Sequence, residues 1–325
     1  MKVGIAGTGL MGETHAGCYT KLEDVELYAV AEQNPEKQNK FRELYPSIKI
    51  YNDFSEMVDD RNIDIIDICL PTPLHKTAAI MALSKNKNVL LEKPIALTIE
   101  EAEEIKQAAD KSKGRFMIAH VLRFWPEYTA IRDTLRNEMK DEQVKSVYAA
   151  RFNELPLWSE NTWIMNEEKS GGIILDLMIH DIDFICWSFG RVKKVYAHSI
   201  LNKSNYAVQV MAVLEMENGV KAYIDGGYLN PAGAGLITQL RVYTSNSLIE
   251  MYPDNIITIK AKDTKAKELP VAKGDGYLEE IKYFINCIRN NNDIATITTE
   301  DAIQSLKVCL ALRTSFKEQR LVTVN

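Results

Sequence analysis

Disulfide, zinc-binding and membrane-spanning patterns are missing from this chain. There are 5 cysteines, an odd number, and they are Cys18, Cys69, Cys186, Cys287 and Cys309. They are widely spaced without a C-x-x-C pair, so we expect reduced, mostly buried thiols rather than a disulfide framework or a metal or redox motif. No apolar run approaches the ~18 residues of a membrane helix. The first residues run straight into glycines without the apolar core of a signal peptide, so we expect a cytoplasmic protein.

An excess of positive charge and any compositional bias are missing as well. Asp and Glu number 45 against 39 for Lys and Arg, so the formal net charge is −6. This balance favours solubility and gives nucleic acid no overall attraction, so neither nucleic acid nor a membrane is an expected partner. With 46% hydrophobic and 26% charged residues, 16 Gly and 10 Pro, the chain has the composition of a globular protein. Its 325 residues suggest two domains.

Strand-like and helix-like segments alternate over residues 1–120. The expected strands are residues 3–6, 25–31, 63–70 and 88–91, and the expected helices are residues 35–44, 75–86 and 98–111. The last of these helices starts at Thr98 with Glu101 three positions on, which is the pattern of an N-terminal cap. Such alternation predicts parallel βαβ units, and hence an α/β Rossmann-type doubly wound parallel sheet with helices on both faces.

Beyond residue 120, strand-like runs follow one another with few helices between them. The expected strands are residues 144–152, 195–201, 206–216, 220–228, 236–244 and 256–260, and helices over residues 276–290 and 299–317 close the chain. We therefore expect residues 121–325 to form an α+β domain with a large, mainly antiparallel open-faced sheet. Its role would be substrate binding and oligomerisation, and its C-terminal helix can pack back on the first domain. A sheet covered on one face favours a homo-oligomer.

A glycine turn directly follows the first expected strand. The run Gly7-Thr8-Gly9-Leu10-Met11-Gly12 is a G-x-G-x-x-G pattern, in which glycines allow a tight turn and let the backbone approach a pyrophosphate. Glu32 lies 20 residues after Gly12, at the end of the second expected strand, where an acid can bind an adenosine ribose. A carboxylate there repels a 2′-phosphate and no arginine follows directly, so the sequence favours NAD over NADP. An ordinary turn with a surface glutamate is the alternative.

Two further loops are predicted at the same sheet edge. Pro71-Thr72-Pro73-Leu74-His75 follows the third expected strand, and Glu92-Lys93-Pro94 follows the fourth. Doubly wound folds bind ligands at the carboxyl ends of their strands, so Pro71, Thr72, His75, Glu92 and Lys93 are candidate cofactor contacts. A helix cap or a surface position is an equal alternative for His75.

A polar stripe marks one expected helix of the second half. Asp176, His180 and Asp183 are spaced by four and three residues within residues 176–188, so they are predicted to project from one face of the helix. A polar stripe on an otherwise apolar helix is costly to bury unless it is used. A metal site is one alternative, but no further histidine ligand is obvious and we expect no metal. A solvated face or a structural network is the other alternative.

The stripe suits the oxidation of an alcohol, which needs a base for the hydroxyl proton while hydride leaves the carbon. Histidine titrates near neutral pH, which favours His180 as acid or base with Asp176 orienting or charging it. Lys93 could stabilise a developing alkoxide as an ammonium or act as the base itself, and both roles stay open.

Candidates to complete a polyol pocket from the second domain are Arg123, Arg151, Trp158, Trp163, Tyr228 and Gln239. Arg123 could equally bind a substrate carboxylate.

Together these motifs resemble the glucose-fructose oxidoreductase, inositol dehydrogenase and MocA family. The likeness rests on the glycine turn, the Pro71–His75 loop, Glu92-Lys93-Pro94 and residues 171–183, and it covers nearly the whole chain in the family's order. It implies that Lys93 lies near the reacting hydroxyl, that Asp176 and His180 are the family's aspartate and histidine, and that Asp183 helps to hold the substrate. The family's glycine run is often three long, whereas here Ser170 precedes Gly171-Gly172. Dimers or tetramers assembled through the sheet are implied too.

The leading hypothesis is an NAD-dependent oxidoreductase that transfers hydride between a secondary hydroxyl of a sugar, inositol or sugar derivative and nicotinamide C4. Its predicted catalytic residues are Lys93, Asp176 and His180, and its predicted substrate contacts also include Arg123, Trp163 and Asp183. An NAD-recycling glycosidase or lyase that uses transient oxidation is the second hypothesis. A non-catalytic nicotinamide-binding sensor is the third, and the intact lysine, aspartate and histidine set argues against it.

Overall fold

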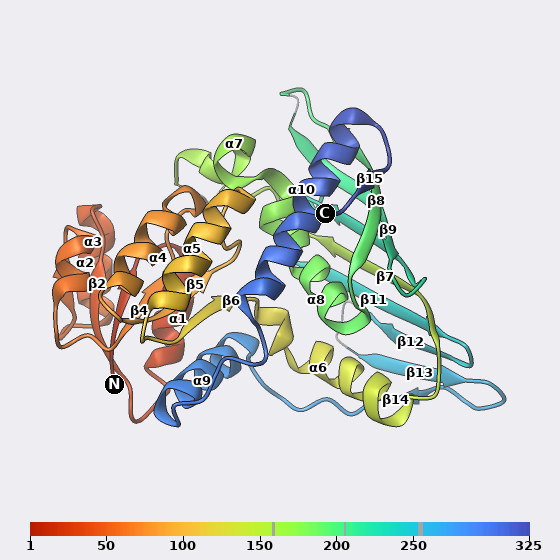
Figure 1. The fold of residues 1–325 in the computed structure, drawn as a ribbon, viewed down its shortest axis with the longest axis horizontal. Helices are drawn as coiled ribbons and strands as arrows, with labels where there is room; N and C mark the ends of the chain where they lie inside the picture. The colour runs from red at the N-terminus through yellow and green to blue at the C-terminus, as the bar shows by residue number, and fades with distance from the viewer. Residues whose placement is uncertain (158–159, 205, 253–255) are drawn as a thin grey trace. The chain divides into compact units, whose positions relative to one another are not determined.

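The computed structural model describes residues 1–157, 160–204, 206–252 and 256–325. The chain divides into two compact units (Figure 1). Unit 1 comprises Met1–Phe124 and Gly274–Ile303, and unit 2 comprises Trp125–Lys273 and Gln304–Asn325. None of the helices in the described part of the chain is both long enough and apolar enough to cross a membrane.

Unit 1 is built on a parallel sheet in the order β3-β2-β1-β4-β5-β6. The strands are β1 (Lys2–Ala6), β2 (Glu26–Ala31), β3 (Lys49–Tyr51), β4 (Ile65–Ile68), β5 (Asn88–Glu92) and β6 (Phe116–Ala119). The helices are α1 (Leu10–Tyr19), α2 (Pro35–Leu44), α3 (Phe54–Asp59), α4 (His75–Ser84), α5 (Ile99–Lys111) and α9 (Gly276–Arg289), with short turns η1 (Thr72–Leu74) and η2 (Val121–Arg123). Helix α4 packs against α5 and α1 packs against α9. The predicted Rossmann-type doubly wound sheet is confirmed.

Local sequence explains where these helices begin. The side chain of Thr98 accepts a hydrogen bond from the Glu101 amide at 3.2 Å, which confirms the predicted cap of α5. Helix α2 starts after Asn34, whose side chain accepts from the Glu36 amide at 2.9 Å, and Pro35 occupies its first turn. Strand β4 is buried over all of its residues, as expected for a parallel strand covered on both faces.

Unit 2 is built on a sheet in the order β14-β13-β12-β11-β7-β10-β9-β8-β15. Its strands are β7 (Val144–Phe152), β8 (Val192–Leu201), β9 (Ala207–Met216), β10 (Lys221–Gly227), β11 (Ile237–Thr244), β12 (Ser247–Met251), β13 (Ile257–Ala261), β14 (Lys267–Glu268) and β15 (Val322–Thr323). All neighbouring pairs are antiparallel except β7 with β10, which run parallel. The predicted α+β unit with a large, mainly antiparallel sheet is confirmed.

Helices cover one face of this second sheet. They are α6 (Pro126–Asp133), α7 (Glu167–Ser170), α8 (Ile179–Phe189) and the larger part of α10 (Thr299–Glu318), with short turns η3 (Thr134–Glu138), η4 (Glu160–Met165) and η5 (Ile174–Met178). The region predicted as one helix over residues 176–188 differs in the structure. It begins with a wide π-type turn, η5, which continues directly into α8. Turn η5 lies against β10, where a Cβ on Gly226 would be 2.4 Å from the Met178 Cγ. Glycine at this position lets the turn approach the sheet closely.

Candidate active-site residues

The glycine turn of unit 1 leaves room for a ligand at the start of α1. Gly7 has φ +88°, and a Cβ there would be 2.7 Å from the Cys69 carbonyl oxygen. A Cβ on Gly12 would be 2.0 Å from the Gly7 carbonyl oxygen, so both positions require glycine for packing. A Cβ on Gly9 would meet no atom within 4 Å, which leaves open space at the N-terminus of α1. This arrangement fits a pyrophosphate, which backbone amides and the helix dipole would hold, with Leu10 and Met11 beside it.

The Glu32 carboxylate is held beside this turn. Its Oε2 accepts from the Thr8 hydroxyl at 2.6 Å and from the Thr8 amide at 3.2 Å, and its Oε1 accepts from the Asn34 amide at 2.9 Å. The acid predicted from spacing alone is thus fixed to the second residue of the glycine run. An anchored carboxylate at this point fits an adenosine ribose.

The two later loops of unit 1 are tied together by His75. Its ring is 1% exposed, with Nδ1 2.8 Å from the Pro94 carbonyl oxygen and Nε2 2.8 Å from the Leu70 carbonyl oxygen. Burial lowers the pKa of His75, and these two acceptors oppose that shift. This side chain therefore joins the loop after β4 to the loop after β5. The contact of His75 with a cofactor stays a prediction.

Glu92 is the last residue of β5 and Lys93 follows it, and the two side chains have different environments. Glu92 is buried, and its Oε2 accepts from the Lys93 amide at 2.9 Å. Lys93 is half-buried. In the same loops Thr72 is buried and Pro71 is half-buried. The structure thus places these predicted cofactor residues on consecutive strand ends, as expected for parallel strands.

In unit 2, Asp176 on η5 accepts a hydrogen bond from the Tyr228 hydroxyl. Tyr228 follows β10, and burial together with the Asp176 carboxylate raises its pKa well above the usual value. It therefore remains a hydrogen-bond donor to the carboxylate. Asp176 and His180 are both half-buried, one turn apart. Sequence reasoning named Tyr228 for the pocket but not as the partner of Asp176.

The rest of the predicted polar stripe is buried. Asp183 is 1% exposed, and its Oδ1 accepts from the Ser305 hydroxyl of α10 at 2.9 Å. Asp181, which sequence reasoning did not single out, binds Arg151 through two hydrogen bonds of 2.6 and 3.2 Å. Arg151 also donates to the Tyr128 hydroxyl at 3.1 Å. Arg151 therefore anchors α8 to β7.

Other predicted substrate contacts fall in varied surroundings. Arg123 is 2% exposed and donates to the Thr296 carbonyl oxygen at 2.8 Å and to Asp301 at 3.1 Å, all within unit 1. Its substrate contact stays a prediction. Trp163 on η4 and Gln239 on β11 are half-buried. Trp158 lies outside the described residues.

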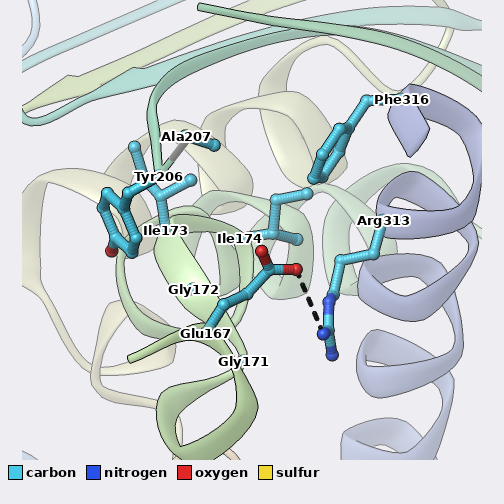
Figure 2. A pocket seen from close by; sticks show the side chains of 9 residues that line it. All are labelled: Glu167, Gly171, Gly172, Ile173, Ile174, Tyr206, Ala207, Arg313 and Phe316. Atoms are coloured by element: carbon cyan, nitrogen blue, oxygen red, sulfur yellow. Dashed lines mark hydrogen bonds and ion pairs between the residues drawn. The ribbon is translucent and has the colours of Figure 1, made fainter. Parts of the chain in front are cut away.

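A small pocket lies where the glycine pair of unit 2 meets α10 (Figure 2). Its lining residues are Glu167, Gly171, Gly172, Ile173, Ile174, Tyr206, Ala207, Arg313 and Phe316. Gly171 and Gly172 have φ of +79° and +73°, which explains why glycines occur just before η5. Glu167 pairs with Arg313 at 3.2 Å and with Lys317 at 2.6 Å. Partial burial works to raise the pKa of Glu167, but these two cations outweigh it and lower the pKa.

One trio of potential metal ligands lies in the described part of the chain. The side-chain donor atoms of His15, Asp67 and Cys69 are within 4.8 Å of one another. Burial and the neighbouring Asp67 charge raise the pKa of the Cys69 thiol. The same atoms are hydrogen-bonded to one another, with the His15 Nδ1 2.8 Å from Asp67.

Comparison with known proteins assigns the family of this site. Residues 1–120 match the family described as "Oxidoreductase family, NAD-binding Rossmann fold", and residues 142–250 match the "GFO/IDH/MocA C-terminal domain". The chain belongs to the GFO/IDH/MocA family. It is an oxidoreductase with an NAD-binding Rossmann fold, and the predicted resemblance is confirmed.

Members of known activity match over the full length of the chain. It is 25% identical to a myo-inositol 2-dehydrogenase of Thermotoga maritima, covering 99% of this chain and 98% of the relative. It is 23% identical to an NADP⁺-linked scyllo-inositol 2-dehydrogenase of Bacillus subtilis, covering 99% and 95%. The structure of a Lactobacillus casei scyllo-inositol dehydrogenase with bound NAD(H) and scyllo-inositol has a TM-score of 0.85 and 25% identity, covering 100% and 99%.

Proposed function

We propose that this GFO/IDH/MocA oxidoreductase is an NAD-dependent dehydrogenase that oxidises a secondary hydroxyl of an inositol, a sugar or a sugar derivative. The observation that carries the proposal is the anchored Glu32 beside the open glycine turn, in a chain that also has a half-buried aspartate and histidine one turn apart. The inositol dehydrogenases among its relatives support this substrate class. Residues 1–120 would bind the coenzyme, and residues 121–325 would bind the substrate and mediate oligomerisation.

Unit 1 would hold the coenzyme with the residues of its strand ends. Gly7, Gly9, Leu10, Met11 and Gly12 would surround the pyrophosphate, and Glu32 would bind the adenosine ribose. The other proposed contacts are Pro71, Thr72, His75, Glu92 and Lys93. When bound, NAD supplies a hydride acceptor at nicotinamide C4. The Glu32 carboxylate would favour NAD over NADP by repelling a 2′-phosphate.

The proton of the substrate hydroxyl would pass to His180. Asp176 would orient the imidazole or stabilise its charged form, and Tyr228 would hold Asp176 in place through the hydrogen bond described above. Lys93 would stabilise developing alkoxide charge as an ammonium, with transfer of the proton to Lys93 as the alternative. Arg123, Trp163 and Asp183 complete the proposed set of substrate residues.

The uncovered face of the second sheet supports assembly into a homodimer or homotetramer. A row of apolar and aromatic side chains crosses this face on β8, β9, β10 and β7, with Tyr196 opposite Val213, Val213 opposite Tyr223, and Tyr223 opposite Tyr148. Val213 is 37% and Tyr223 47% exposed, which is unusual for such a continuous patch in a monomer. A second copy of the chain would cover this apolar face. The proposed location of the protein is the cytoplasm. Light scattering is expected to give a dimer or tetramer for the wild type and a smaller species for Tyr223→Arg, and a monomeric wild type would contradict this assembly.

The proposed activity is tested by NADH formation from a panel of inositols, aldoses, sugar acids and amino sugars, with NAD and NADP in parallel. We expect one polyol class to give NADH, and the signal to vanish in Lys93→Ala and His180→Ala. Lys85→Ala is the control, since Lys85 is an exposed lysine that pairs with Asp59 at 2.6 Å and has no place in the proposed site. Silence across the panel with tight NAD binding would instead support the NAD-recycling glycosidase or lyase.

A further inference from the structure

A buried polar cluster lies under the predicted coenzyme site of unit 1. His15 on α1 is fully buried, and its Nδ1 is 2.8 Å from Asp67 Oδ2 on β4. Asp67 also accepts from the Tyr19 hydroxyl at 2.9 Å and from the Cys69 thiol at 3.4 Å, so three donors surround this buried carboxylate. On the other side of the ring, the His15 Nε2 makes no hydrogen bond among the described residues and is 3.4 Å from Glu92 Oε1, within ion-pair distance. The imidazole thus lies between two acidic side chains from neighbouring strands.

The surroundings of His15 favour its charged form. Burial works to lower the pKa of His15, but Asp67 and Cys69 together outweigh it through charge and hydrogen bonding and raise this pKa well above its usual value. The other titratable groups near the cluster are Tyr19 on α1, Cys69 after β4, and Tyr277 and Glu280 on α9. A charged His15 imidazole, with Asp67 on one side, attracts the Glu92 carboxylate on the other.

The same loop is held a second time, just after Lys93. His75 contacts the Pro94 carbonyl oxygen, as described above, and Glu92 accepts the Lys93 amide through the oxygen that does not face His15. Both chain neighbours of Lys93 therefore contact a buried histidine. The Glu92 side chain lies against His15, and the Pro94 carbonyl oxygen lies against His75.

We propose that His15 and His75 are positioning residues that fix Lys93 from both sides, His15 through Glu92 and His75 through Pro94. The inference rests on the proposed function in taking Lys93 as a catalytic residue, but the geometry it describes belongs to unit 1 alone. Neither histidine would touch the reacting atoms. Displacing a catalytic group by about 1 Å can lower the rate about 100-fold, which is the scale of effect that loss of either contact would have.

Paired amide substitutions separate the two contacts of each histidine. Asparagine places an amide nitrogen near the position of Nδ1, and glutamine places one near Nε2. His15→Asn would therefore keep Asp67 and lose Glu92, whereas His15→Gln would keep Glu92. In the same way, His75→Gln would lose the Pro94 contact and His75→Asn would keep it. Ile105→Ala on α5 is the control for general loss of stability, because Ile105 is fully buried and its side chain is apolar.

The primary readout is hydrogen exchange of the backbone amides of residues 92–97, followed by mass spectrometry without coenzyme or substrate. We expect faster exchange in this segment for His15→Asn and His75→Gln than for their partner variants, and no such selective change for Ile105→Ala. Equal exchange within both pairs would overturn the proposal. Should His15→Asn not fold, Glu92→Gln keeps the side-chain shape while weakening the same contact, and unchanged exchange there would overturn the role of His15.

The second readout is steady-state kinetics on the substrate that the polyol panel identifies. We expect kcat to fall about 10- to 100-fold for His15→Asn and His75→Gln, with the Kd for NADH changed less than about threefold. An unchanged kcat in both variants would refute the positioning role. A wild type without dehydrogenase activity would count against the proposed function, while the exchange result would still decide this inference.

Discussion

Glu32 is expected to set both the affinity for NAD and the preference over NADP. The perturbation is Glu32→Gln, which keeps the length of the side chain and removes its charge. A carboxylate has about four acceptor sites. Two donors from Thr8 and one from Asn34 occupy three of them, and a fourth, on Oε1, would accept a ribose hydroxyl.

The expected change in NAD affinity follows from the loss of the one hydrogen bond proposed at this fourth acceptor site. One hydrogen bond to a charged group contributes about 1.5 to 3 kcal/mol, so its loss should weaken NAD binding about 10- to 100-fold. The affinity for NADP should fall less, because removal of the negative charge also removes repulsion of the 2′-phosphate. The ratio of the NAD affinity to the NADP affinity should therefore fall, by up to about 10- to 100-fold.

The assay is titration of protein fluorescence with NADH and with NADPH, for the wild type and Glu32→Gln at the same ionic strength. Thr8→Val is the matched control, since it removes the 2.6 Å hydroxyl contact and leaves the carboxylate charge in place. Thr8→Val should weaken the binding of NADH and of NADPH by similar factors. A folded Glu32→Gln protein with an unchanged NADH to NADPH affinity ratio would refute the assignment of Glu32 to the ribose.

Four further predictions concern other parts of the molecule. Gly9→Ala should fold with an unchanged Tm but bind NADH at least about tenfold more weakly, whereas Gly12→Ala should lower Tm because its Cβ would be 2.0 Å from the Gly7 carbonyl oxygen. Equal Tm values for the two would contradict the geometry of the turn. Tyr228→Phe removes the donor to Asp176 and should lower kcat about tenfold with little change in KM; steady-state kinetics with an unaltered kcat would argue against it. Asp181→Asn leaves Arg151 without its buried counter-charge and should cost about 3 to 5 kcal/mol in urea unfolding, with Arg151→Met/Asp181→Leu closer to wild type; a loss below about 1 kcal/mol would show the pair to be unimportant. Because the pKa of His15 is raised on folding, its stabilisation is complete below its unfolded pKa of about 6.5 and is lost as pH rises through the folded value. The difference in unfolding free energy between wild type and His15→Gln should thus shrink as the pH rises above about 6.5, and a difference that grows with pH would contradict the charged form.

Much of the fold was predictable because its signals are local. The glycine turn, the Thr98 cap and the alternation of short aliphatic runs with helices each depend on residues close in sequence. Strands β3, β6, β12, β14 and β15 were missed. Strand β3 has only three residues, and β12 follows β11 after so short a connection that its apolar run is difficult to separate from its neighbour.

The candidate site was predictable in its residue types more than in its contacts. Spacing correctly placed Asp176 and His180 one turn apart, but it could not show that Asp183 is buried against Ser305 of α10, 122 positions along the chain. Asp181 was overlooked for the same reason, since it lies on α8 and its partner Arg151 lies on β7, 30 positions earlier in the chain. His15 follows the last glycine of the turn by three positions, and that histidine within α1 was the available signal for the buried cluster.

The central claim is that hydride passes from a substrate carbon to NAD with net formation of NADH. The most direct test uses the polyol found by the panel, deuterated at the carbon that carries the reacting hydroxyl, with wild-type protein and excess NAD. The account predicts that the deuterium appears at C4 of the NADH formed and that the rate falls relative to the undeuterated polyol. Turnover of the substrate with deuterium retained in the product and no labelled NADH would contradict it.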